Sequence, residues 1–540
     1  MNEHLEALAE RDLLIRVDRE INKDTELHPL VRWQYRGGIP EKDRKAFLFT
    51  NVVDSNGEKF DMPVTVGALA GNPSIYGVGL GADVSEVNQK WDNALSNPID
   101  PVEVDSADAP VHDIVYSGSD LDEPGKALDG IPVPISTPGF DNAPYTTMSA
   151  FITHDPETGV RNVGIYRAQL KGRKRTGMNP SVEWGKGVYE HWKVAKERGE
   201  TLPAAIAVSA PPAVAYTSAQ SLGFGVDEMA VSGGLVGEPI HEVEGKTQPV
   251  MVPARADLII EGEIRTDVLE PEAPFGESHG FINNKEYNMV MDVTGITKRE
   301  DAVYTSIISQ VTPSESSVIK KTALEPLFLK HLREECKLTC VKDVTLHEPL
   351  TNLRKLIIIQ MERGTKRSLV WRALTACASF RSSHGKFVVA VDEDIDPDNL
   401  DAVFWAIGYR SKPHEDTQII KGRSVGHAPR RDDRGEASDS AILWDATLKH
   451  PMPPISLPAK EYMEHAKEIW DELGLPELNP EMPWYGYSLG EWNDELREEA
   501  KLAVEGRYFE TGEKLKDQQV SSDDVEPNSN VFNHDDFDEE

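Results

Sequence analysis

The pattern of apolar segments changes along this chain, and those changes constrain its fold most strongly. Over residues 116–315, short apolar runs alternate with turns rich in Pro, Gly and Asp, which is typical of a barrel or sandwich of many strands. Residues 1–115 mix short helices and strands. Beyond residue 335, strand-like and helical runs alternate, which indicates an α/β layer. A single core stops growing at roughly 250–300 residues, so a chain of 540 residues is expected to form several domains.

These patterns predict a mixed α/β (α+β) chain with four structured parts and a tail. We expect an N-terminal α/β domain (1–115), a strand-rich domain (116–315), a linker helix (316–335) and a C-terminal α/β domain with terminal helices (336–510). Residues 511–540 are acidic and contain few core-forming side chains, a composition typical of a disordered tail. The clearest strands expected in the strand-rich domain are 149–154, 204–208, 258–264 and 304–308.

Acidic residues outnumber basic ones by 92 to 57, which gives a formal net charge of −35. The excess is spread along the chain, so it argues against binding to nucleic acid or to an anionic membrane surface. One explanation is a soluble protein kept dispersed by self-repulsion. The other is a halophilic protein from a salt-rich cytoplasm, where screening removes that repulsion. We favour the second explanation.

Three features indicate a cytoplasmic protein. No run of about 18 apolar residues is present, so no membrane span is expected. The N-terminus is acidic and lacks the basic, then apolar, pattern of a signal peptide. The three cysteines, Cys336, Cys340 and Cys377, are too few for a disulfide framework and are expected to be reduced.

Two segments of the strand-rich region carry the clearest candidate chemistry, Asn162–Arg167 and Glu272–Glu277. An arginine beside two carboxylates can keep one of them ionised and let the other carry a proton. A surface ion network is the alternative, because 28% of the residues are charged. The glycine and aromatic neighbours of Glu277 favour contact with a ligand, and burial near aromatics suits a general acid.

Asn162 and Glu228 form a second candidate group. An amide oxygen and a carboxylate are hard ligands that suit Mn²⁺ or Mg²⁺ holding a phosphate. A helix cap or a solvated side chain is the usual role of a glutamate in the position of Glu228, so these two residues alone indicate a metal site only weakly.

Taken together, these segments resemble the UbiD family of prenylated-FMN-dependent decarboxylases, of the type that acts on 4-hydroxybenzoate or its 3-polyprenyl derivatives. The resemblance covers roughly residues 1–475 and is densest at 162–167, 227–233 and 271–281. It implies a split β-barrel flavin-binding domain flanked by an N-terminal α/β domain and a C-terminal α/β dimerisation domain.

The resemblance also implies an activity. Members of the family are carboxy-lyases that reversibly and without oxidation remove CO2 from aromatic or α,β-unsaturated carboxylic acids. The implied cofactors are prenylated FMN and Mn²⁺, with K⁺ as a further ion. The implied partners are a small carboxylic acid substrate, a flavin prenyltransferase that supplies the cofactor, and further copies of the chain in a homodimer or larger homo-oligomer.

Carried over by position, the family's catalytic network corresponds to Arg167, Glu272 and Glu277. Glu277 is then the proton donor, and Arg167 orients the two carboxylates and contacts the flavin. Ile165, Tyr166 and Arg167 line the cofactor.

The implied metal ligands are Asn162 and Glu228. The segment 179–186 departs from the family's pattern for a third ligand, and Glu183 is the best candidate there.

Two alternatives to decarboxylation stay open. The same residues serve a carboxylase that runs the reverse reaction, and a catalytically silent flavin-binding or assembly protein is possible in principle. The intact arginine and both glutamates argue against a silent protein. The substrate stays open among quinone precursors, isoprenoid-pathway acids and dietary aromatic acids.

Overall fold

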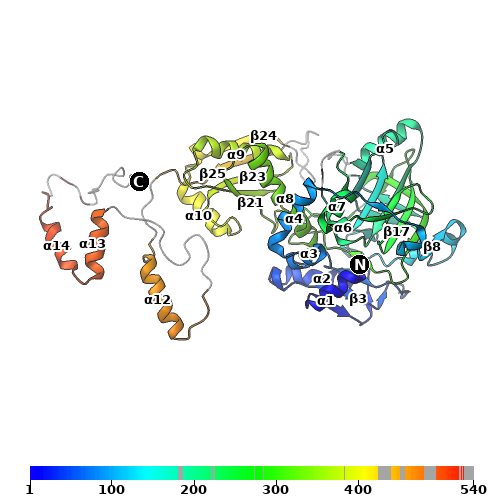
Figure 1. The fold of residues 1–540 in the computed structure, drawn as a ribbon, viewed down its shortest axis with the longest axis horizontal. Coiled ribbons are helices and arrows are strands. Elements are labelled where there is room, and N and C mark those ends of the chain that lie inside the picture. The colour runs from blue at the N-terminus through cyan, green and yellow to red at the C-terminus, as the bar shows by residue number, and fades with distance from the viewer. Residues whose placement is uncertain are drawn as a thin grey trace.

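Among the described residues, the strands form two large sheets and three small ones, and most of the helices lie beside these sheets (Figure 1). This arrangement is the mixed α/β fold that the sequence predicts. The computed structural model describes residues 1–180, 187–220, 222, 225–272, 274–283, 285–381, 383–423, 439–450, 456–478, 494–521, 525 and 527.

The N-terminal part contains a four-stranded sheet in the order β1-β3-β6-β20. Its last strand, β20, comes from far along the chain and pairs in parallel with β6. The predicted boundary at residue 115 therefore does not separate this sheet from the strand-rich region. The elements of the sheet and of its surroundings are α1 (Asn2–Glu10), β1 (Leu14–Val17), β2 (Ile21–Asn22), α2 (Leu27–Arg36), β3 (Ala46–Phe49), β4 (Val52–Val53), β5 (Lys59–Phe60), β6 (Val64–Val66), α3 (Pro73–Leu80), α4 (Val87–Ser96) and β20 (Tyr304–Ser306).

A ten-stranded sheet, called the central sheet because it lies in the middle part of the sequence, has the main order β11-β10-β14-β17-β19-β13-β12-β9. All of its pairings are antiparallel, the arrangement in which consecutive strands can be joined by tight turns. Its strands are β8 (Ile114–Ser117), β9 (Tyr145–Thr146), β10 (Ser149–His154), β11 (Arg161–Ile165), β12 (Ala168–Gly172), β13 (Arg175–Met178), β14 (Leu202–Val208), β17 (Leu258–Ile264), β18 (Glu270–Glu272) and β19 (Glu286–Lys298).

Both faces of this sheet are buried. Along β14, Ala204 and Ile206 pack into one core, whereas Ala205 and Ala207 pack into another on the opposite face. This alternation follows from the two-residue period of a strand. Helices and a small sheet complete these cores, namely α5 (Gly187–Arg198), α6 (Pro212–Ser218), α7 (Glu228–Val236), β7 (Val102–Glu103), β15 (His241–Glu244) and β16 (Met251–Pro253).

The C-terminal part is a five-stranded sheet in the order β21-β22-β23-β25-β24. Its central strands β22, β23 and β25 are parallel, which requires crossover helices between them. Cores lie on both faces, because Ile357 and Ile359 pack on one side and Ile358 on the other. The elements are β21 (Val341–Leu346), β22 (Leu356–Met361), α9 (Arg367–Phe380), β23 (Phe387–Asp392), α10 (Leu400–Arg410), α11 (Pro413–Asp416), β24 (Thr417–Arg423) and β25 (Asp439–Asp445).

Helix α8 (Glu315–Lys330) joins the central and C-terminal parts and packs against both. Val318 belongs to a core of the N-terminal half, whereas Phe328 belongs to the core of the C-terminal sheet. At its start, the buried Glu315 carboxylate accepts hydrogen bonds from the backbone N–H groups of Gly67 and Leu69, each at 3.0 Å. The helix predicted as a linker is thus fixed at both ends.

Three further helices follow, α12 (Lys460–Glu472), α13 (Asp494–Val504) and α14 (Tyr508–Lys516). Helix α14 corrects part of the predicted tail, because residues 511–516 are helical. Of the rest of that tail, the structure describes only residues 517–521, 525 and 527. Within the part of the chain that the structure describes, no helix has the length and hydropathy needed to cross a bilayer.

We predict that the folded state is more stable in concentrated salt. The net charge of −35 produces strong like-charge repulsion at low ionic strength. The Debye length falls from about 30 Å at 0.01 M to about 3 Å at 1 M, so concentrated KCl removes most of this repulsion. Thermal melts in 0.01 M and in multimolar KCl should show a higher midpoint in concentrated salt.

Sucrose serves as the control, because it strengthens burial without screening charge. An unchanged midpoint across the KCl range would contradict the halophilic interpretation and would leave the candidate active site untouched.

Candidate active site

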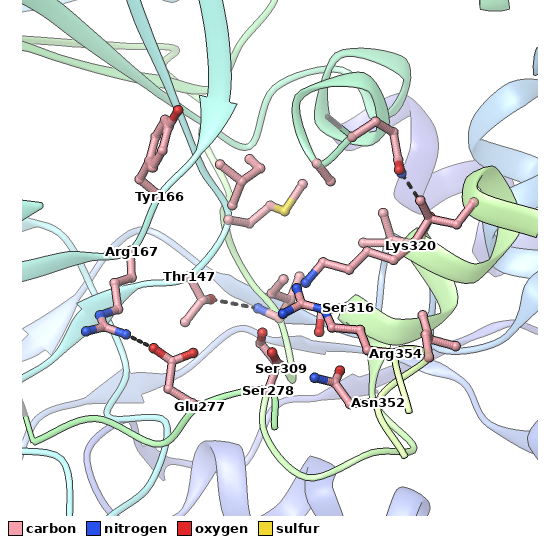
Figure 2. A pocket seen from close by; sticks show the side chains of 18 of the residues that line it. Thr147, Tyr166, Arg167, Glu277, Ser278, Ser309, Ser316, Lys320, Asn352 and Arg354 are labelled. Carbon is pink, nitrogen blue, oxygen red and sulfur yellow. Dashed lines mark hydrogen bonds and ion pairs between the residues drawn. The ribbon is translucent and has the colours of Figure 1, made fainter. Parts of the chain in front are cut away.

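A cavity of about 230 Å³ lies where the central sheet meets the C-terminal part (Figure 2). One side of its wall is the end of β11 and the two residues that follow it. The turn that contains Glu277 closes a second side. Helix α8 and the loop that precedes β22 close the opposite side. Segments separated by up to two hundred residues in the sequence therefore meet around one space.

Arg167 lies between β11 and β12 and holds both predicted carboxylates. Its Nε donates to Glu272 Oε1 at 2.8 Å, and its Nη2 donates to Glu272 Oε2 at 2.9 Å. Its third nitrogen, Nη1, forms an ion pair with Glu277 Oε1. A guanidinium that binds a carboxylate through two parallel hydrogen bonds is fixed in orientation as well as in position. The structure thus brings together the three residues predicted to be catalytic.

The two carboxylates occupy different surroundings. Glu272 has a fully buried side chain and also accepts a hydrogen bond from Asn288 Nδ2 at 2.6 Å. The side chain of Glu277 is 18% exposed, lines the cavity and accepts from Asn283 Nδ2 at 3.0 Å. Glu272 is therefore tied into the protein, whereas Glu277 is the carboxyl group that faces the cavity and can exchange a proton with a bound molecule.

The residues just before Glu277 explain why its backbone lies close to the cavity. The Phe275 ring lies 5.1 Å from the Arg167 guanidinium and packs on Tyr145 at a centroid distance of 4.5 Å. Gly276 fits against Thr137 at a distance that leaves no room for a Cβ atom. A rigid aromatic support and a residue without a side chain together bring the backbone of this segment up to the cavity.

Tyr166 and Ile165 line the cavity next to Arg167. Tyr166 is buried, and burial raises the pKa of its hydroxyl to about 12, so the ring stays neutral. The Ser149 hydroxyl donates to the Tyr166 carbonyl oxygen at 2.7 Å, which fixes the backbone at this point. Figure 2 shows Tyr166 and Arg167 on the same wall of the cavity.

The two described candidates for metal binding lie next to each other. Asn162 is in β11, and Glu228 is the first residue of α7. The backbone N–H of Val163 donates to Glu228 Oε2 at 3.2 Å, which brings the carboxylate beside β11. Burial raises the pKa of Glu228 to about 7. Neither Asn162 nor Glu228 is among the described residues that line the cavity.

These surroundings fit a cation. The buried Asn162 amide nitrogen has no hydrogen-bond partner among the residues that the structure describes. That nitrogen is a donor and needs an acceptor, so the support for a cation comes from the buried Glu228 carboxylate, whose ionised form a nearby cation favours. Glu183, the third predicted ligand, lies outside the described residues. Across the described ranges, no group of three or more His, Cys, Asp or Glu side chains is arranged to hold a metal ion.

Sequence reasoning missed the opposite side of the cavity. Lys320 in α8, Arg354 in the loop before β22 and Arg381 directly after α9 all line it. Figure 2 shows Lys320 and Arg354 across the cavity from Arg167 and Glu277. No local motif marks these residues, because each belongs to an element whose sequence pattern is explained by packing alone.

The comparisons with known proteins agree with this fold. Residues 102–311 match the family model described as the 3-octaprenyl-4-hydroxybenzoate carboxy-lyase Rift-related domain. Residues 319–446 match the C-terminal domain of the same enzyme family. The matches to both of these domains define a carboxy-lyase class of protein. The chain belongs to the UbiD family, whose members are decarboxylases.

Individual relatives are more distant. An uncharacterised protein of Archaeoglobus fulgidus is 30% identical over 296 residues, which are 55% of this chain and 60% of that relative. The chain thus matches less than two thirds of that relative's length.

Two solved structures of the UbiD-class enzyme HmfF from Pelotomaculum thermopropionicum are 27% identical to this chain and cover 86% of it and 99% of HmfF. The structure that contains prenylated FMN superimposes with a TM-score of 0.72, and the one that contains FMN with 0.74. The vanillic acid decarboxylase of Sedimentibacter hydroxybenzoicus in its closed form shares the fold, with a TM-score of 0.73 at 23% identity over 87% of this chain and 98% of that chain.

Proposed function

We propose that this protein is a prenylated-FMN-dependent carboxy-lyase that removes CO2 from an aromatic or α,β-unsaturated carboxylic acid. One observation carries the proposal: Arg167 holds Glu272 and Glu277 together at the wall of a cavity, and only Glu277 faces the cavity. Membership of the UbiD family supports the reaction class, and the cofactor in the HmfF structure supports the flavin.

The chemistry explains why so few protein groups are needed. Loss of CO2 from an sp² carbon leaves a carbanion without stabilisation, and the bound flavin supplies the electron sink. Orientation of the reacting groups and delivery of a proton are then the roles of the protein side chains. Arg167 orients the substrate carboxylate and Glu277, and Glu272 holds Arg167 in place. Glu277 then delivers a proton to the carbon atom that has lost CO2. The reverse reaction, carboxylation, uses the same groups.

The cofactor site follows from the same geometry. We infer that Ile165, Tyr166 and Arg167 form the wall against which the flavin lies. Asn162 and Glu228 would hold Mn²⁺ at its phosphate, with Glu183 as the proposed third ligand and K⁺ as a further ion. The ten-stranded sheet then corresponds to the flavin-binding domain and the sheet over residues 341–445 to the dimerisation domain. The HmfF structure, described as an evolved dimeric form, supports a homo-oligomer.

A silent flavin-binding or assembly protein is the competing function. Such a protein has no need for a carboxyl group that faces the cavity, nor for an arginine that orients it. The presence of both in one hydrogen-bonded network favours catalysis.

Co-expression with a flavin prenyltransferase tests the proposal. We expect the purified protein to carry a flavin with the mass of prenylated FMN, and to release CO2 from at least one member of a panel of aromatic and α,β-unsaturated acids. Protein expressed without the prenyltransferase is the control and should be inactive. Purified protein that carries no flavin would contradict the proposal, and flavin without any CO2 release would favour the silent protein.

A further inference from the structure

We propose that the end of the cavity formed by Lys320, Arg354 and Arg381 binds a second anionic group of the substrate. The substrate is then a dianionic acid: one carboxylate lies at Arg167 and Glu277 and is lost as CO2, and the other anionic group is held at the far end. This inference rests on the proposed function, because it assumes that the cavity is the substrate site.

The three cationic side chains come from three separate elements and line one space. Lys320 comes from α8, Arg354 from the loop before β22, and Arg381 follows the last residue of α9. In Figure 2, the side chains of Lys320 and Arg354 extend into the cavity from the side opposite Arg167 and Glu277. A molecule that spans the cavity therefore meets the proton donor at one end and these cations at the other.

The charge at the cavity wall is opposite in sign to that of the whole chain. Among the described residues that line it, Arg167 is paired with the carboxylates of Glu272 and Glu277, and the other lysine and arginine side chains are Lys320, Arg354 and Arg381. The chain as a whole carries a formal net charge of −35. An acidic surface repels anions, whereas a cavity with cationic walls concentrates them. The positive charge of the side chains at this part of the wall therefore indicates an anionic ligand.

The electrostatic surroundings of these side chains agree with a concentrated positive field. Burial, and then the neighbouring Arg381, lower the pKa of Arg354 to about 10, so it stays charged at neutral pH. His384, which also lines the cavity, has a pKa well below its usual value, first because it is buried and then because of Arg354 and Arg381.

The loop that carries Arg354 has a strained backbone. Leu350, Asn352 and Leu353 have φ angles of +61°, +53° and +58°, a region that residues with a side chain rarely adopt. Asn352 and Leu353 line the cavity beside Arg354. Backbone strain of this kind clusters at ligand-binding sites, where the position of a side chain matters more than local stability. The strain indicates that this loop serves a ligand.

Arginine side chains bind carboxylates and phosphates alike through forked hydrogen bonds, so the second group is a carboxylate or a phosphate. The lysine beside the two arginines adds a compact point charge, which attracts a carboxylate and a phosphate alike. The predicted substrate class is therefore an aromatic or α,β-unsaturated acid that carries a carboxylate or a phosphate at the end away from the reacting carbon.

Binding to the holoenzyme tests this inference without the need for turnover. The probes are benzoate with one anionic group, terephthalate with two carboxylates, and 4-carboxyphenyl phosphate with a carboxylate and a phosphate. Their dissociation constants are measured by titration calorimetry at one fixed KCl concentration. We expect at least one dianion to bind about 10- to 100-fold more tightly than benzoate, the gain typical of a charge-assisted hydrogen bond.

Arg354→Gln should make the dianions bind with nearly the same dissociation constant as benzoate. Benzoate binding and flavin content should stay unchanged. Arg354→Lys should retain part of the preference, because it keeps the charge and loses the fork. Lys355→Gln is the matched control: it removes the same charge from the next residue, which is not among the described residues of the wall, and it should leave the preference intact.

A wild-type protein that binds all three probes with equal affinity would overturn the inference. Loss of flavin in Arg354→Gln would also overturn it, because this end would then belong to the cofactor. Tighter binding of terephthalate would identify a second carboxylate, and tighter binding of 4-carboxyphenyl phosphate would identify a phosphate. Failure of the proposed function itself shows differently, as missing flavin or missing CO2 release in the wild type.

Discussion

Replacement of Glu277 by glutamine is expected to leave the flavin bound and to reduce the rate of CO2 release about 10²- to 10⁴-fold, the usual cost of losing one general acid. The amide has nearly the same shape as the carboxyl group, so it can keep its contacts with Arg167 and Asn283. It carries no proton that it can give to carbon. Steady-state CO2 release, with flavin absorbance recorded on the same sample, separates loss of chemistry from loss of cofactor.

Two further variants make this result specific. Glu300→Gln removes a carboxylate from an exposed position and should leave the rate unchanged. Glu272→Gln removes a positioning residue that holds Arg167 but does not line the cavity. It should lower the rate and shift the pH dependence, because Arg167 then pairs with Glu277 alone. A Glu277→Gln enzyme with wild-type turnover would show that another group is the acid.

The part of the site that could be predicted is the part with short, rigid sequence motifs. Arg167 follows directly on a strand, and Glu277 follows Phe275 and Gly276, so both the strand ending and the turn are visible as local patterns. The long-range pairing of Arg167 with Glu272 is not visible in either segment. It arises because β18, which ends at Glu272, lies beside β19 in the same sheet as β12 and β13. The resemblance to a known family supplied that pairing.

The rest of the cavity could not be predicted, for a different reason. Lys320 lies on a helix whose apolar residues are explained by packing, and Arg354 and Arg381 flank ordinary α/β elements. Each is one basic residue among 57 in the chain. Only the docking of the C-terminal part onto the central sheet turns them toward one space, and that docking depends on surface shape rather than on periodicity.

For the fold too, the sequence predicts local elements but not how distant elements pair. The strand at residues 304–308 was predicted, and the structure has β20 over Tyr304–Ser306. Its partner could not be predicted: β20 pairs with β6, more than two hundred residues earlier. Strand propensity is a local property, whereas a parallel pairing depends on the path of the chain between the strands. Domain boundaries drawn from composition therefore fail where a strand crosses them.

If Asn162 and Glu228 hold Mn²⁺ as we propose, substitution of either by alanine is expected to remove the metal and, with it, tight retention of the flavin. Each variant loses one hard oxygen ligand, and the cation that offsets the phosphate charge is then held too weakly to survive purification. Glu228→Ala should have the larger effect, because it also removes the negative charge that attracts the cation. Elemental analysis and flavin absorbance of the purified variants provide the measurement.

Glu238→Ala is the matched control for this result, because Glu238 is an exposed carboxylate that follows α7 closely in the sequence. It should keep wild-type metal and flavin content. Burial raises the pKa of Glu228 to about 7, although the Val163 backbone N–H that it accepts lowers it in part, so removal of the metal is expected to leave a carboxyl group that takes up a proton near neutral pH. Full metal occupancy in both Asn162→Ala and Glu228→Ala would place the cation elsewhere, and loss of flavin with the metal retained would make these residues direct cofactor contacts instead.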